Sequence, residues 1–221
     1  MTKKLIDYFK KFYKKKDCRN LVLVERFDYI PSLINYALLA NVLSDIHNAK
    51  IVTYYPNKIN FLKLFYTNFK RILKNKNIDY LYECFGSTNV IRPKLSKKKN
   101  VEIKFKNKIA VQNFKFKNIL IGDLMYDEYL RSNKKITINL DDQDFIRHVS
   151  YTLNLFDFWY NFILKNPVKA MVISHSVYNM GIVCRIAIKF NIPVYTTGPR
   201  GLHYLNNKYL TKHSKNRYKN Y

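Results

Sequence analysis

The chain has 221 residues, a length that suits one domain or one and a half. Of these residues 48% are hydrophobic and 16% aromatic, which is ample for a hydrophobic core. Its formal net charge of +25 suits an anionic partner such as nucleic acid, an anionic membrane or a phosphorylated lipid, although a bias toward Lys, Asn, Ile and Tyr along the whole chain explains it equally well. Three widely spaced cysteines argue against a disulfide framework or a zinc site. We expect no signal peptide and no transmembrane helix, because residues 1–16 lack an apolar segment and no apolar run reaches roughly 18 residues.

Residues 1–17 are predicted to form a basic amphipathic helix, because apolar side chains recur on one face while most lysines lie elsewhere. Its aromatic face, with Phe9 and Phe12 inward, is expected to pack on the domain. The alternative is that the helix lies on an anionic membrane. We therefore expect a cytoplasmic protein whose membrane contact, in that alternative, is peripheral and at the inner face.

Residues 18–205 are predicted to form one Rossmann-like domain. Two strands, over 20–25 and 50–55, flank a helix that begins at Pro31, a residue suited to the first helical position. This β-α-β unit is the connection that parallel strands require. A further helix is expected over 58–74.

The segment 92–117 is a basic excursion from this domain, with nine lysines and a single acid, Glu102. Alternating pieces such as 101–105 indicate exposed strands or a departure from the core. A charge run of this kind is usually a solvated face, and it lacks the aromatic patterning of a nucleic-acid site.

Three more buried strands are expected in the second half of the chain, over 118–122, 170–174 and 192–196. Asp141 or Asp142 is the predicted N-cap of a long helix between the first two, and another helix is expected over 177–190. A short final helix is expected to begin at residue 202 and to fray into a polar tail over 206–221.

The alternation of strands and helices predicts an α/β fold: a Rossmann-like, mostly parallel sheet with helices on both faces. In such sheets ligands bind outside the carboxyl ends of the strands. Polar groups follow four of the expected strands, at Glu25–Arg26, Gly122–Asp123, Ser174–Ser176 and Gly198–Arg200. The sequence therefore predicts a ligand site at this rim.

His175 is the predicted general base, since its ordinary pKa suits proton transfer near neutrality, and Asp123 is the second candidate or the group that orients His175. Both residues are expected to lie on one rim of the sheet and to flank a bound acceptor, the substrate whose hydroxyl proton the base removes. Purely structural roles stay open: Asp123 as a turn cap, His175 bonded to backbone, Arg200 as a surface charge. Asp127 and Arg131, four residues apart, equally suit an ordinary helix ion pair.

Motifs for cofactors and metals are missing from the sequence. It has no P-loop, no GxGxxG, no HExxH and no GxSxG. The acids of Asp141–Asp144 are explained by helix capping rather than by the DxD motif of metal-dependent glycosyltransferases. No cofactor and no metal are expected.

The run Asn118–Arg131 resembles the "GDLIYDTYLR"-like segment of bacterial capsule and lipopolysaccharide glycosyltransferases of the GT-B type, which have two Rossmann-like domains. Phe156–Trp159, then Val172–Tyr178 and Ile182–Tyr195, are similar to further segments of that family, including its "SHxxY…G…RxAxKxxIPVY" stretch. The resemblance covers roughly residues 118–205, in the family's order and spacing.

The resemblance implies an N-terminal, acceptor-side domain whose substrate is a saccharide or a lipid-linked saccharide. The rim and the matched segments together give these candidate substrate-binding residues: Glu25, Arg26, Tyr126, Asp127, Arg131, Ser174, Ser176, Tyr178 and Arg200. In the two-domain enzymes the nucleotide-sugar donor, a substrate, sits mainly on the C-terminal domain. Because the chain stops at Tyr221, we expect a truncated product, a half that works with a separate donor-binding domain, or a degenerate relative.

Two other classes of function remain open. The charge alone supports a basic nucleic-acid-binding module, although nucleic acid is the less favoured partner because no recognised motif accompanies the charge. The N-terminal helix supports a non-catalytic scaffold at an anionic membrane surface.

Overall fold

The computed structural model describes residues 7, 16–27, 30–58, 78–95, 103–198 and 201–206. The elements in chain order are β1 (Leu21–Glu25), α2 (Ile30–Ile46), β2 (Lys50–Tyr54), α4 (Ile78–Cys84), β3 (Ser87–Ile91), α5 (Lys108–Gln112), β4 (Lys115–Phe116), β5 (Ile119–Leu120), α6 (Gly122–Asn133), α7 (Gln143–Lys165), β6 (Val168–Val172), the 3-10 helix η1 (Tyr178–Met180), α8 (Gly181–Lys189), β7 (Val194–Gly198) and β8 (Gly201–Leu205).

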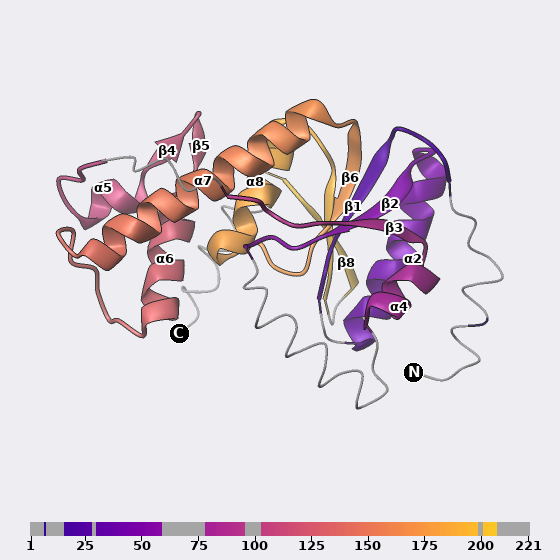
Figure 1. Ribbon diagram of the computed structural model, residues 1–221, viewed down its shortest axis with the longest axis horizontal. Coiled ribbons are helices and arrows are strands. Elements are labelled where there is room, and N and C mark those ends of the chain that lie inside the picture. Colours follow the sequence, from indigo (N-terminus) through magenta and orange to yellow (C-terminus); the bar gives the residue numbers. More distant parts are fainter. Residues whose placement is uncertain are drawn as a thin grey trace.

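The centre of the protein is a six-stranded sheet in the order β3-β2-β1-β6-β7-β8. Neighbouring strands run parallel from β3 to β7, and β8 is antiparallel to β7. Figure 1 shows α2 and α4 on one face and α7 and α8 on the other. The chain therefore adopts the α/β, Rossmann-like fold that the sequence predicts, and its strand order reverses between β1 and β6.

The strand β1 shows why residues 21–24 are all apolar. Leu21 and Leu23 belong to the hydrophobic cluster on the α7 and α8 side, while Val22 and Val24 belong to the cluster on the α2 side. Successive side chains of a strand point to opposite faces, and here both faces are covered. The run is consequently apolar without a break.

A small lobe beside the sheet corrects the prediction of a core strand over 118–122. The strand β5 instead pairs antiparallel with β4, and Figure 1 shows this hairpin, α5 and α6 around the N-terminal half of α7, away from the sheet. Lys117 and Asn118 both have positive φ, 49° and 61°. Two such residues form the tight turn that joins antiparallel strands, so the local hairpin replaces the expected place in the sheet.

The turn into α6 depends on Gly122. A Cβ at this position would lie 1.8 Å from the carbonyl oxygen of Val111 and 2.7 Å from the backbone nitrogen of Phe114. The start of α6 thus lies directly against the end of α5 and the hairpin. The described part of the predicted basic excursion, up to β4, lies outside the six-stranded sheet.

The two edges of the sheet also depart from expectation. The edge strand β3 was not predicted, because its sequence STNVI lacks an apolar run and its side chains after Ser87 are only partly buried or exposed. The helix expected from residue 202 is wrong over the described residues, where β8 pairs with β7. Leu202 and Tyr204 are about half exposed, as the outward side chains of an edge strand are.

Two predicted helix boundaries are confirmed. The side chain of Asp142 caps α7 by accepting a hydrogen bond of 2.9 Å from the backbone N–H of Asp144. The helix α8 is followed by Asn191 in the left-handed conformation, with φ of 56°. It begins at Gly181, somewhat later than predicted, because the one-turn helix η1 precedes it.

Some predictions concern residues outside the described ranges. These are the N-terminal helix up to residue 15 apart from residue 7, the helix over 58–74 apart from residue 58, Arg200, and the tail beyond residue 206. Within the described part of the chain, no helix combines the length and the apolar character needed to cross a bilayer.

Candidate functional site

The reversal of strand order places Glu25 beside Ser174. Glu25 ends β1, and Ser174 follows the neighbouring strand β6. The backbone N–H of Ser174 donates to one carboxylate oxygen of Glu25 at 2.8 Å, and its hydroxyl donates to the other at 2.6 Å. The side chain of Glu25 is only 2% exposed, so the carboxyl group is held beneath the rim rather than offered to solvent.

His175 continues this chain of hydrogen bonds to the surface. Its Nδ1 lies 2.9 Å from the hydroxyl oxygen of Ser174, and its ring meets Phe27 edge to face with centroids 5.5 Å apart. When Glu25 is ionised, its carboxylate takes the single hydroxyl proton of Ser174, so the hydroxyl oxygen accepts from Nδ1–H of His175. In the neutral imidazole the lone pair is then on Nε2, which is the arrangement a general base needs.

Burial shifts the pKa values of the side chains at and near this hydrogen-bonded chain. Desolvation raises the pKa of Glu25 to about 7, against the lowering effect of its hydrogen bonds from Ser174. Burial, followed by the negative charge of Glu25, raises the pKa of Tyr36 to about 12. Near neutral pH, Glu25 therefore exchanges between its protonated and ionised forms beneath His175.

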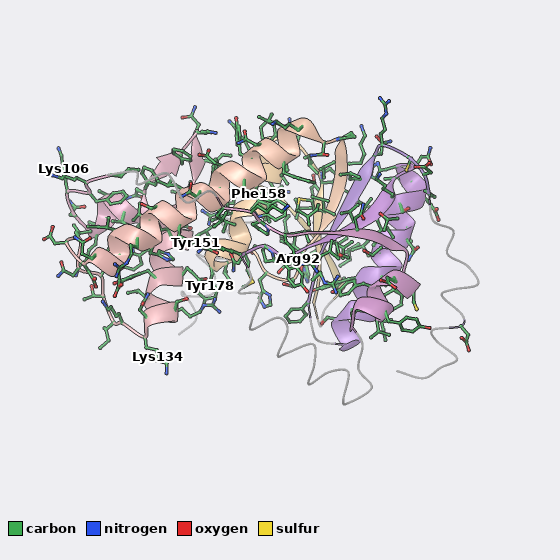
Figure 2. The ribbon with its side chains drawn as sticks, in the orientation of Figure 1. Arg92, Lys106, Lys134, Tyr151, Phe158 and Tyr178 are labelled. Atoms are coloured by element: carbon green, nitrogen blue, oxygen red, sulfur yellow. The ribbon has the colours of Figure 1, made fainter. Side chains whose placement is uncertain are left out.

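The surroundings of His175 favour its neutral form. Partial burial, with a smaller contribution from the positive charge of Arg131, lowers the pKa of the imidazole. Arg131 stacks over the ring of Tyr178, with its guanidinium carbon 4.2 Å from the ring centroid. Figure 2 shows Tyr178 beside α6, the helix that carries Arg131.

Tyr178 has an uncommon backbone conformation, with φ of 56°. For a bulky residue this left-handed conformation costs on the order of 1 kcal/mol and concentrates at functional sites. The loop that leads to it packs closely on α8, since a Cβ on Gly181 would lie 2.4 Å from the carbonyl oxygen of Ser176. Ser176 thus lies in the loop between His175 and Tyr178, with its carbonyl oxygen against the start of α8.

Asp123 does not lie at the rim, contrary to prediction. It occupies the first turn of α6, because the strand before it belongs to the hairpin and not to the main sheet. Its two oxygens accept from Nη1 and Nη2 of Arg185 on α8, each at 2.6 Å. This bidentate pair ties α6 to α8, and it engages both oxygens that a base would use.

Arg131 also differs from expectation in its ion pair. Its Nη2 lies 3.0 Å from a carboxylate oxygen of the buried Glu128, one turn earlier in α6, so the pair predicted with Asp127 is replaced. Asp127 is exposed, and its pKa is raised by partial burial and then by the nearby charge of Asp123. Tyr126 packs partly buried against the main core.

Arg26 lies at the rim as predicted, but it is only 7% exposed. Its guanidinium carbon is 4.5 Å from the ring centroid of Tyr82 and 5.2 Å from that of Tyr55, and its Nη1 donates to the hydroxyl of Thr53 at 3.4 Å. Of the predicted site residues, the structure thus brings Glu25, Ser174 and His175 into direct contact, with Arg131 and Tyr178 beside them.

Sequence reasoning missed Arg185 and Glu128. Arg185 is flanked by apolar residues in the middle of α8, and a charge in such surroundings signals a buried or interfacial partner. The sequence gave no comparable signal for Glu128, because Asp127 also has a spacing from Arg131 that suits a helix ion pair. The described residues contain no cluster of three or more His, Cys, Asp or Glu side chains that could hold a metal ion.

Comparisons of the chain with protein-family models, with curated proteins and with solved structures found no match. The resemblance to surface-polysaccharide glycosyltransferases accordingly stays a prediction.

Proposed function

We propose that the protein is the acceptor-side half of a glycosyltransferase of capsule or lipopolysaccharide biosynthesis, with His175 as the base that activates the acceptor. One observation carries the proposal: the hydrogen-bonded chain of Glu25, Ser174 and His175 at the point where the strand order reverses. Ligands of such sheets bind outside this point. The segments similar to the glycosyltransferase family, which include Ser174 and His175, support the same assignment.

In the proposed reaction the acceptor is a saccharide or a lipid-linked saccharide, and one of its hydroxyl groups reaches Nε2 of His175. The imidazole takes the hydroxyl proton as the oxygen forms its bond to the anomeric carbon of the donor sugar. The bond between that carbon and the phosphate oxygen breaks, and the nucleotide leaves with the electron pair. Ionised Glu25, acting through Ser174, holds Nδ1 protonated so that Nε2 stays free.

The donor side is proposed to come from a separate nucleotide-sugar-binding domain, as in the two-domain enzymes that the sequence resembles. We place the reaction in the cytoplasm, at the inner face of the membrane when the acceptor is lipid-linked. The net charge of +25 supports contact with an anionic membrane surface.

The experiment that tests the proposal measures transfer of labelled sugar to saccharide acceptors by the chain together with a donor-binding domain. Replacing His175 by Ala is expected to lower turnover about 10²-fold or more, because a positioned base contributes at least that factor. His47→Ala is the matched control, since His47 lies just before β2 begins and therefore at the amino ends of the strands, opposite the rim that carries His175. Equal turnover in the two variants would remove His175 from the role. DNA binding that falls steeply with salt, without any response to saccharides, would favour the nucleic-acid alternative.

A further inference from the structure

We infer that the N-terminal segment, residues 3–15, packs its apolar side on the outward face of α2, where Leu38, Val42 and Ile46 form an exposed stripe. Of this segment the structure describes residue 7 alone. The contact is supported by the burial pattern of α2, by residue 7, and by Lys16, which directly follows the segment. It does not depend on the proposed function.

The outward face of α2 is apolar although it is exposed. Leu38, Val42 and Ile46 are 48%, 55% and 68% exposed, and their spacing of four residues places them in one row about 12 Å long. The inward side of the helix is apolar as well, with Leu33 and Leu43 buried in the core. A helix that is apolar on all sides is normally covered on all sides. The stripe therefore calls for a second partner besides the sheet.

The N-terminal part of the chain joins the domain beside this stripe. The ammonium group of Lys16 donates to the backbone carbonyl of Ser44 at 2.9 Å and to a carboxylate oxygen of Asp45 at 2.6 Å, in the last turn of α2. Asp45 directly precedes Ile46. Only two residues separate Tyr13 from Lys16, and three residue steps span at most about 10 Å. The C-terminal end of the segment is thus kept close to the C-terminal end of the stripe.

The apolar side of the segment matches the stripe in spacing and length. Leu5, Phe9 and Tyr13 also follow one another at intervals of four residues, and in a helix they too form a row about 12 Å long. Because Tyr13 is kept near the C-terminal end of the stripe, the two helices run in the same direction and Phe9 comes level with Val42. Two helices at a small crossing angle stay in contact over such a length.

The charges of the segment and of α2 favour this contact over other partners. Asp7 is helical and exposed, on the half of the helix opposite Phe9, and the six lysines of the segment share that half and reach solvent. Asp45, whose side chain is 79% exposed beside the stripe, opposes insertion into an anionic membrane. The net charge of +25 opposes the docking of a second copy of the chain.

The test measures disulfide formation within the full chain, with Cys18→Ser in every variant and the other two native cysteines buried. The pair Phe9→Cys and Val42→Cys is expected to close under mild oxidation, because level positions on packed helices bring the thiols within bonding reach. The pair Asp7→Cys and Val42→Cys is the matched control, since Asp7 lies on the other half of the same helix. Mass spectrometry should show the first pair closing about tenfold faster or more.

Amide hydrogen exchange gives a second measurement that needs no substitution at Phe9. Exchange over residues 5–13 should be slowed in the unaltered chain and should quicken about tenfold or more in Val42→Lys, because a charge on the stripe breaks the apolar contact. Ile109→Lys makes the same change at a position on α5 that is 66% exposed, and Figure 1 shows α5 at the other end of the molecule from α2. This control should leave the exchange of residues 5–13 as it is.

Equal closure of the two cysteine pairs, or exchange over residues 5–13 that Val42→Lys leaves unchanged, would overturn the contact. Disulfides that join two molecules would assign the stripe to a second copy of the chain and would overturn it as well. Exchange that slows only when vesicles containing phosphatidylglycerol are added would assign the segment to an anionic membrane, which is again a result against the contact with α2.

Discussion

Replacing Glu25 by Gln should change how the stability of the protein depends on pH. Glu25 is 2% exposed, and burial raises the pKa of its carboxyl group from 4.5 to about 7. The folded state therefore binds a proton more tightly than the unfolded state does. This contribution to stability is fully present below the unfolded pKa and is lost as the pH rises through the folded pKa.

The size of the effect follows from the shift. At 1.36 kcal/mol for each pKa unit, raising the pH from about 5 to about 8 should reduce the free energy of unfolding of the unaltered chain by roughly 2–3 kcal/mol through Glu25 alone. A glutamine has nearly the same shape and does not titrate, so the variant should lack this part of the decline. Urea unfolding of both proteins across that pH range, with the difference taken at each pH, isolates Glu25 from every other titrating group.

The free energy of unfolding of the Glu25→Gln variant should rise relative to that of the unaltered chain as the pH rises. Two stability curves that stay parallel from acid to alkaline pH would refute the buried, proton-retaining carboxyl group. A variant that loses relative stability with rising pH would refute it as well, since that sign belongs to a carboxylate stabilised in its ionised form.

Two further predictions concern the lobe beside the sheet. Gly122→Ala should destabilise the protein by about 2–4 kcal/mol in thermal or urea unfolding, because the new Cβ would meet the carbonyl oxygen of Val111; a change below about 0.5 kcal/mol would contradict the tight turn. Asp123→Asn should cost about 1–2 kcal/mol and increase hydrogen exchange in α6, because the partly exposed bidentate pair with Arg185 is weakened; unaltered exchange would contradict its role in tying α6 to α8.

The core of the fold could be predicted because its signals are local. Residues 21–24 of β1 and residues 170–173, at the end of β6, are apolar runs that end at the polar residues Glu25 and Ser174, and α7 begins at an acid that caps it. Two-sided burial in a parallel sheet produces such runs directly. The edge strand β3 escaped prediction because an edge needs little apolar surface.

The hairpin at Lys117–Asn118 escaped prediction for a different reason. A two-residue turn with positive φ usually contains glycine, which makes it recognisable in the sequence. Here Lys117 and Asn118 adopt this conformation instead. The apolar residues after it, Ile119 and Ile121, are buried as expected, but in the lobe and not in the sheet. Burial was predictable from the sequence, whereas the partner strand was not.

The sequence predicted that Glu25 and Ser174 lie at the carboxyl ends of strands, but it did not predict the hydrogen bonds that join them to His175. Glu25, Ser174 and His175 are brought together because β1 and β6 are neighbours, which the order of strands along the chain does not reveal. The burial of Glu25 beneath Ser174, and hence the raised pKa, arises from that pairing. The ion pair between Asp123 and Arg185 is equally non-local, and Asp123 lies away from the rim because the strand before it belongs to the hairpin.

The tautomer of His175 tests the account most directly, because the proposed role requires a free Nε2. Long-range nitrogen–proton NMR correlations of the isotope-labelled chain report which ring nitrogen carries the proton. Above the pKa of Glu25, the hydrogen bonds from Nδ1 to Ser174 and from Ser174 to Glu25 predict the Nδ1–H form, and Ser174→Ala should shift the population toward Nε2–H. An Nε2–H imidazole in the unaltered chain at that pH, or a tautomer that ignores the loss of the Ser174 hydroxyl, would contradict the account.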